Sequence, residues 1–163
     1  NDLNHLGIKI ENGEKNTVTT YKLNLMDLNE ETIQIPPAQF SSVITMPSSD
    51  FQKICRDMHN LADTIEIKSV GSQLIFGCKG DFAQQETVMS ESASNGMSFV
   101  KKQENTEIIQ GNFALKHLVL FTKCTNLCNQ IEMYLKNDYP LIICYSVASL
   151  GNIKLCLAPL CEN

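Results

Sequence analysis

Four cationic side chains stand on two short segments with helical spacing, at residues 48–61 and 110–124. They are Lys53, Arg56, Lys116 and Lys123. Only two acidic residues share these segments, so the rest of the chain holds 9 of the 13 Lys/Arg residues and 16 of the 18 Asp/Glu residues. Positive charge gathered locally on a protein of net charge −5 indicates a surface that faces something anionic.

The spacing of the cations favours a long polyanion over a single small anion. Lys116 and Lys123 are seven residues apart, which is about 10 Å along a helix axis. That distance suits separate phosphates of a nucleic-acid duplex. A solvated polar helix face is the simpler interpretation of the same residues, and the pattern alone leaves both open.

Catalytic and metal-binding chemistry find little support in the sequence. A nucleophilic pair would need Cys55 or Cys124 beside His59 or His117, and the expected helix turns Cys55 inward. Gly-rich phosphate loops, paired-histidine motifs and G-x-S-x-G are absent from the sequence. Cys124 and Cys128 form only half of a zinc motif. We therefore expect no enzymatic activity, no metal and no cofactor.

The cysteines and the chain ends bear on the cellular setting. Seven scattered cysteines, with no apolar leader among residues 1–13, indicate free thiols in a reducing compartment. No apolar run approaches the length of a membrane span, so we expect no membrane partner. The chain begins at Asn1 without methionine, which suggests an internal piece of a longer protein.

The first 39 residues divide into a hairpin and a connector. Apolar residues alternate around a turn at residues 11–13, which predicts a hairpin within residues 1–24. A lone hairpin is marginal in water, so its strands should belong to a larger sheet. Residues 25–39 lack periodicity and contain Pro36 and Pro37, which predicts an extended connector.

From Phe40 onward, one order of elements occurs twice. The first copy predicts strands at 42–46, 64–68, 73–78 and 82–90, with a helix from Ser48 after the first strand and a loop at 92–103. The second predicts strands at 107–110, 130–136, 141–147 and 153–157, with a helix capped by Asn112 and ending at Cys124. Two βαβββ units predict an α+β fold, in which antiparallel sheets carry two helices packed on one face.

Four motifs now become recognisable together. They are LMDLNEETIQIP at 25–36, DFQKICRDM at 50–58, FALKHLVLFTK at 113–123 and LAPL at 157–160. In this order and spacing the chain resembles the proliferating cell nuclear antigen sliding clamps of eukaryotes and viruses. The likeness implies the DNA-clamp fold, with the last strands of an N-terminal domain at 1–24, the interdomain connecting loop at 25–39, the C-terminal domain at 40–160 and a tail at 161–163.

The resemblance implies a function without catalysis. Clamps of this family usually close as homotrimers around duplex DNA and hold polymerases and other replication and repair enzymes through PCNA-interacting peptides. A clamp loader, and a location in the nucleus or at a viral replication site, follow from the same likeness. The alternative is a checkpoint-clamp-like or monomeric processivity factor that forms no homotrimeric ring.

The resemblance also assigns roles to residues. Lys53, Arg56, Lys116 and Lys123 correspond to cations that face DNA. The client-peptide pocket corresponds to Ile33, Ile35, Pro36, Pro140, Leu157, Ala158 and Pro159. The subunit interface pairs two edge strands that correspond to residues 17–23 and 82–90, and it includes Tyr21, Phe82 and Val88. Cys156 departs from the family, which usually has an aromatic residue there.

Overall fold

The computed structural model describes residues 4–26, 38–92, 94, 96–102 and 107–161. The chain forms two compact units, residues 1–37 and 38–163. The first unit contains the predicted hairpin, in which β1 (His5–Asn12) and β2 (Thr17–Asn24) pair antiparallel. Leu6 lies opposite Leu23 and Ile8 opposite Tyr21, so the alternation places the apolar side chains on one exposed face.

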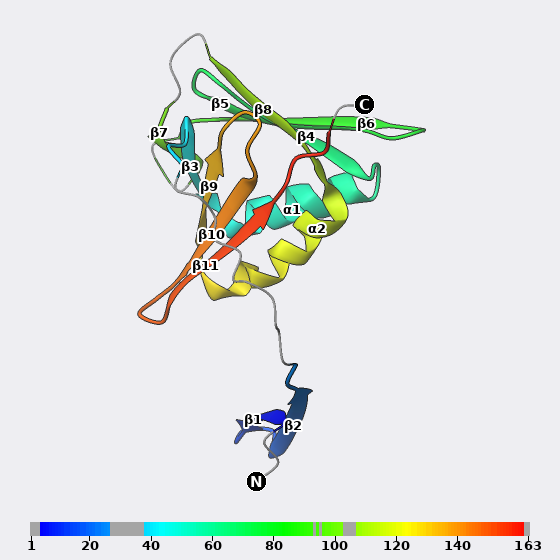
Figure 1. The fold of residues 1–163 in the computed structure, drawn as a ribbon, viewed down its shortest axis with the longest axis vertical. Helices are drawn as coiled ribbons and strands as arrows, with labels where there is room; N and C mark the ends of the chain where they lie inside the picture. Colours follow the sequence, from blue (N-terminus) through cyan, green and yellow to red (C-terminus); the bar gives the residue numbers. More distant parts are fainter. Residues whose placement is uncertain (1–3, 27–37, 93, 95, 103–106, 162–163) are drawn as a thin grey trace. The chain divides into compact units, whose positions relative to one another are not determined.

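The second unit contains both predicted βαβββ repeats (Figure 1). The first consists of β3 (Ser42–Pro47), α1 (Ser48–His59), β4 (Thr64–Val70), β5 (Gln73–Lys79) and β6 (Gln84–Ser90), and β7 (Ser98–Lys101) follows it. The second consists of β8 (Ile108–Ala114), α2 (Leu115–Phe121) with the 3-10 helix η1 (Thr122–Leu127), β9 (Gln130–Leu135), β10 (Leu141–Val147) and β11 (Gly151–Leu157). The predicted α+β architecture is confirmed.

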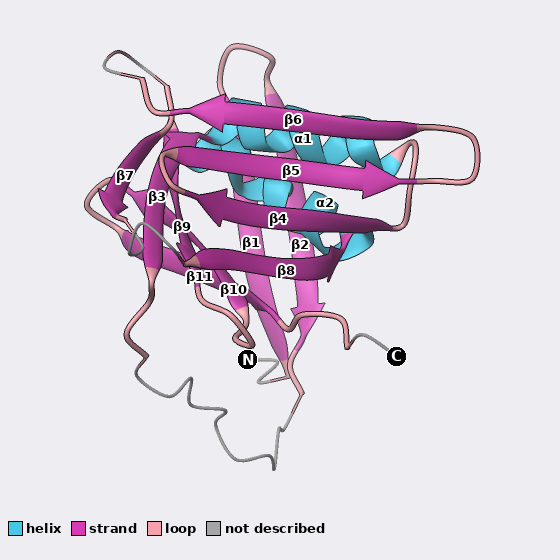
Figure 2. Cartoon of the chain, turned by 90° about the horizontal axis from the view of Figure 1, so that it is seen from above, coloured by secondary structure: helices cyan, strands magenta, loops and turns pink. Residues whose placement is uncertain are grey.

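The two repeats exchange their first strands. One sheet has the order β6-β5-β4-β8 and the other β11-β10-β9-β3-β7, so β8 joins the strands of the first repeat and β3 joins those of the second. All of these pairings are antiparallel. Each α-helix therefore connects a strand of one sheet to a strand of the other. Both helices lie on the same side of the four-stranded sheet (Figure 2).

The core follows from two periodicities in the sequence. Strands β3, β4 and β5 alternate buried and half-buried residues, as strands with one face in the core do. In α1 the buried residues recur at helical spacing, with Phe51, Ile54, Cys55 and Met58 facing the sheets. Between β3 and β4, the buried hydroxyls of Ser42 and Ser69 lie 3.0 Å apart, so one polar contact links the two sheets inside the core.

The start of the second helix differs from the prediction. Asn112 is not a helix cap, because β8 continues to Ala114 and pairs with β4 over its whole length. The carbonyl oxygen of Asn112 accepts a hydrogen bond from the backbone N–H of Leu160, so the residue belongs to a strand edge. The α-helix then ends at Phe121, and a 3-10 helix continues the chain beyond Cys124. Long-range strand pairing has outweighed the local capping signal.

Strand β6 is also shorter than predicted, because it begins at Gln84. Phe82 therefore lies in the preceding turn and is 78% exposed. Helix α1 begins at Ser48, as predicted. The Ser48 hydroxyl bonds outside α1, to backbone carbonyls near η1.

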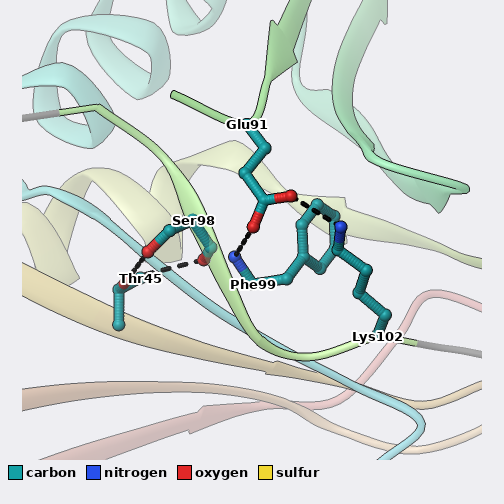
Figure 3. Close-up of polar contacts among 5 residues, drawn as sticks. All are labelled: Thr45, Glu91, Ser98, Phe99 and Lys102. Carbon is teal, nitrogen blue, oxygen red and sulfur yellow. Dashed lines mark hydrogen bonds and ion pairs between the residues drawn. The ribbon is translucent and has the colours of Figure 1, made fainter. Parts of the chain in front are cut away.

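Strand β7 lies within the segment that the sequence predicts to be a loop. Glu91 accepts a hydrogen bond from the backbone N–H of Phe99 and forms an ion pair with Lys102 at 2.6 Å (Figure 3). The side-chain hydroxyls of Thr45 and Ser98 lie 2.7 Å apart across the β3–β7 pair. These contacts and the backbone pairing with β3 hold a strand of only four residues, in which Phe99 and Val100 favour β-structure.

Among the described parts of the chain, no helix combines the length and the apolar character needed to cross a membrane.

Candidate nucleic-acid interface

Helix α1 presents two of the predicted cations to solvent. Lys53 and Arg56 are exposed, while Phe51, Ile54 and Met58 are buried on the opposite side of the helix. An acidic residue in the first turn and a basic residue in the last both suit the helix dipole. The apolar stripe packs on the sheets, so the two cations point away from the core.

The second helical segment presents the other two predicted cations to solvent. Lys116 lies on α2 and Lys123 on η1, and both are exposed. Leu115 and Leu118 are buried on the inward side of α2. Leu120, which the sequence analysis did not single out, is 53% exposed and lies between the two lysines in the sequence.

Hydrogen bonds tie the two helical segments together. α1 and α2 pack against each other (Figure 1), and α1 also contacts η1. Gln52 donates from Nε2 to the carbonyl oxygen of Thr122 at 3.1 Å, and the Ser48 hydroxyl donates to the carbonyl oxygen of Cys128 at 2.7 Å. The start of α1 thus lies beside η1. The two helical segments that carry the four cations therefore lie side by side.

The positive charge of these two segments is not consumed by nearby carboxylates. Ion pairs among the described residues involve other lysines, namely Lys9, Lys68 and Lys102. The four helical cations therefore keep their charge available for an external anion.

Four residues of the predicted peptide pocket lie at one end of the β10–β11 pair. Leu141 and Leu157 are paired at the end of the ladder, so Pro140, which precedes β10, and Ala158, which follows β11, lie just beyond that end. Ala158 is exposed, while Pro140, Leu157 and Pro159 are half-buried. The predicted pocket residues Ile33, Ile35 and Pro36 lie outside the described residues.

An aromatic cluster beside Pro140 was missed by the sequence analysis. The ring of Phe40 packs edge-on against Tyr134 and Tyr139, with centroid distances of 5.3 and 5.6 Å. Tyr134 donates a hydrogen bond to the carboxylate of Glu132, and this bond, with burial, raises the pKa of the phenol to about 12. The position of Tyr139 next to Pro140 was the available sequence signal.

The three predicted subunit-interface residues are exposed, and each has a different setting. Tyr21 lies on β2 and Val88 on β6, and β6 is one of the two edge strands of the four-stranded sheet. Phe82 lies in the turn before β6, outside the strand itself. Unpaired edge strands with exposed apolar side chains are suited to pairing with another strand.

Comparison with known proteins identifies the family. The family model of the proliferating cell nuclear antigen C-terminal domain matches residues 34–160. That is more than three quarters of the chain, and it includes every element of the second unit. The chain belongs to the proliferating cell nuclear antigen family.

Two viral relatives support this membership. The chain is 34% identical over 98% of its length to a probable DNA polymerase sliding clamp 1 of Paramecium bursaria Chlorella virus 1. It is 35% identical over 92% of its length to a probable DNA polymerase sliding clamp of Acanthamoeba polyphaga mimivirus. The chain spans 61% of the first relative and 31% of the second.

The cysteines of this clamp-family chain are free thiols in the described residues. No group of three or more His, Cys, Asp or Glu side chains suited to a metal ion occurs in that part of the chain, which includes Cys124 and Cys128. Burial raises the pKa of the Cys55 thiol to about 12, so it is almost entirely protonated at neutral pH. A protonated, buried thiol is a packing residue and a poor nucleophile.

Proposed function

We propose that the chain is part of a DNA sliding clamp, a processivity factor that holds a DNA polymerase on duplex DNA. The observation that carries this proposal is the surface formed by α1, α2 and η1. It exposes Lys53, Arg56, Lys116 and Lys123 on two helical segments that pack side by side. The names of the two viral relatives point to the same class of protein.

The chemistry of this surface suits sliding. Lysine and arginine side chains attract phosphates without reading base identity, so the protein can move along DNA of any sequence. A helix lying on the backbone through a few cations makes contacts that are individually weak. Retention then depends on a ring that closes around the duplex, which we propose to be a homotrimer assembled by a clamp loader at the site of DNA replication.

The exposed strand edges supply a route to ring assembly. Edge strand β6 with Val88, the neighbouring Phe82, and the hairpin strand β2 with Tyr21 are the proposed contacts between subunits. Backbone pairing across such edges would cover the unpaired N–H and C=O groups. A processivity factor that works as a monomer would leave these edges open.

The end of the β10–β11 pair is the proposed docking site for client enzymes. Pro140, Leu157, Ala158 and Pro159 combine exposed and half-buried apolar surface there, and the Phe40–Tyr139 ring pair adjoins Pro140. The family resemblance assigns Ile33, Ile35 and Pro36 of the connector to the same pocket, and these three lie outside the described residues. A short helical turn with aliphatic and aromatic anchors is the expected ligand, because such anchors dominate the energetics of groove recognition.

Charge reversal tests the DNA-binding proposal. The double variant Lys116→Glu, Lys123→Glu and a control, Lys154→Glu with Lys79→Glu, alter exposed lysines by the same total charge. Fluorescence anisotropy with a labelled 30-base-pair duplex measures the affinity of the full chain at several salt concentrations. We expect the helix variant to lose affinity at low salt and to reduce the slope of log K against log[salt] by about 2 units. Equal behaviour of the two variants would refute the assignment.

Assembly is tested separately by size-exclusion chromatography with light scattering on the full chain and on its Val88→Glu variant. Wild-type oligomers that the substitution dissociates would support edge pairing. A wild-type monomer at every concentration would favour the monomeric alternative.

A further inference from the structure

We propose that Leu120 is a DNA-contacting residue, which packs against the deoxyribose surface between the phosphates held by Lys116 and Lys123. This inference rests on the proposed clamp function and specifies the chemistry of the same surface. It adds an apolar contact to a face that the cations alone would make purely electrostatic.

The position of Leu120 within the helix places it among the cations. Lys116 and Leu120 have the i, i+4 spacing that puts side chains on one side of α2, and Lys123 follows three residues later in η1. All three are exposed, whereas Leu115 and Leu118 on the other side are buried. Along the α2 axis Leu120 stands about 6 Å from Lys116.

The side chain of Leu120 is available to a partner. It lies outside the buried stripe of α2 and is 53% exposed. Leu120 is preceded on α2 by Lys116 and followed on η1 by Lys123, and neither lysine forms an ion pair among the described residues. This setting suits a partner that is both anionic and partly apolar. A duplex backbone has this composition, because apolar sugar carbons separate its charged phosphates.

Lysine–phosphate contacts and apolar contacts change the salt dependence of DNA affinity in different ways. A lysine that neutralises a phosphate releases a counterion and therefore steepens the dependence of affinity on salt. An apolar contact releases no ions, so its loss lowers the affinity equally at all salt concentrations. The salt slope thus distinguishes the role of Leu120 from the role of its neighbours.

The experiment compares four forms of the full chain: wild type, Leu120→Ser, Lys116→Ser and the control Leu150→Ser. Leu150 is 87% exposed in the turn between β10 and β11, so it matches the chemistry of the change away from the helices. Circular dichroism establishes that each variant keeps its fold. Anisotropy titrations with a 30-base-pair duplex of mixed sequence, between low and moderate salt, then give the affinity and the salt slope.

We expect Leu120→Ser to weaken binding by about three- to tenfold at every salt concentration, with the wild-type slope, whereas Leu150→Ser changes nothing. Lys116→Ser should reduce the slope by about 1 unit. Wild-type affinity for Leu120→Ser, together with a reduced slope for Lys116→Ser, would overturn the inference about Leu120 and leave the clamp surface intact. If Lys116→Ser also has no effect, the proposed function itself fails.

Discussion

The side chain of Gln52 donates a hydrogen bond to the carbonyl oxygen of Thr122, with 3.1 Å between Nε2 and the oxygen. Each of these residues directly precedes a cation of the proposed DNA-binding surface, Lys53 on α1 and Lys123 on η1. The bond crosses from one helical segment to the other. Uncharged groups thus set the relative positions of two charged side chains that belong to different halves of the sequence.

Removing this bond should loosen η1 without altering its charge. Gln52→Met keeps the length of the side chain and removes the donor, so the Thr122 carbonyl loses its partner from α1. We expect a loss of about 1 kcal/mol in the free energy of unfolding. Urea denaturation measures this loss, and hydrogen exchange of the η1 amides should accelerate. The control Gln73→Met changes an exposed glutamine at the start of β5. Equal exchange rates in both variants would show that the bond does not brace η1.

Gly80 is required by a close approach of two backbone segments. A Cβ atom at this position would lie 1.8 Å from the carbonyl oxygen of Leu61. Because both groups are fixed by the backbone, Gly80→Ala should lower the unfolding free energy by about 2 kcal/mol or more. Gly13→Ala is the matched control, since nothing lies within 4 Å of its added methyl group. Thermal denaturation of the two variants gives the comparison, and similar melting temperatures would contradict the contact.

Ala158 is the best position for testing the proposed peptide pocket. Leu157 packs partly against the core, so shortening it would mix a folding effect with a binding effect. Ala158 is exposed, and Ala158→Arg should block an incoming hydrophobic anchor with little cost to stability. Calorimetry with a peptide that carries an aliphatic–aromatic helical turn should show a loss of at least about 2 kcal/mol in binding free energy. Asn152 is exposed on β11, the strand that precedes Ala158, and Asn152→Arg should bind the peptide normally. Unchanged binding by Ala158→Arg would move the pocket elsewhere.

The thiols should fall into two classes of reactivity. Burial raises the pKa of Cys55 to about 12, so at pH 8 only about one molecule in 10,000 carries its thiolate. Cys161 is exposed. We expect iodoacetamide to label Cys161 within minutes and Cys55 only after denaturation, as read by peptide mass spectrometry. Fast labelling of Cys55 in the folded protein would show that α1 opens readily from the sheets.

Glu91 should show an acid-shifted titration. Its hydrogen bond from Lys102 lowers the pKa of the carboxyl, and the backbone N–H of Phe99 lowers it further. A depressed folded pKa means that the contact is fully present above the unfolded value of about 4.3 and is lost as the pH falls through the folded value. The amide NMR signal of Phe99 should therefore titrate with a midpoint below that of an ordinary glutamate. Glu91→Gln should abolish this titration and Glu86→Gln should leave it intact; persistence in Glu91→Gln would assign the titration to another group.

The sequence predicted the elements whose burial has a regular period. Alternation identified strands such as β3 and β5, and the i, i+3, i+4, i+7 stripe beginning at Phe51 identified α1. The same stripe predicted that Lys53 and Arg56 point outward, which the exposed side chains confirm. These successes share a cause, because the side of an element that faces the core is encoded within a dozen consecutive residues.

The failures involve partners that are distant in the sequence. Asn112 looks like a helix cap, but β8 continues through it because β4 and the segment at Leu160 supply hydrogen bonds. Strand β7 lies in the predicted loop and is held by contacts from Glu91 and Thr45. In each case the competing local preference is worth about 1 kcal/mol, which a few tertiary hydrogen bonds exceed.

The sequence by itself determined the family, the two repeats and the charges of the helical segments. Only the tertiary structure decided that the repeats exchange strands, that Gln52 and Ser48 join α1 to η1, and that Leu120 remains exposed between lysines. Local patterns report which side of an element is buried, but the identity of the neighbour that buries it depends on contacts between residues far apart along the chain.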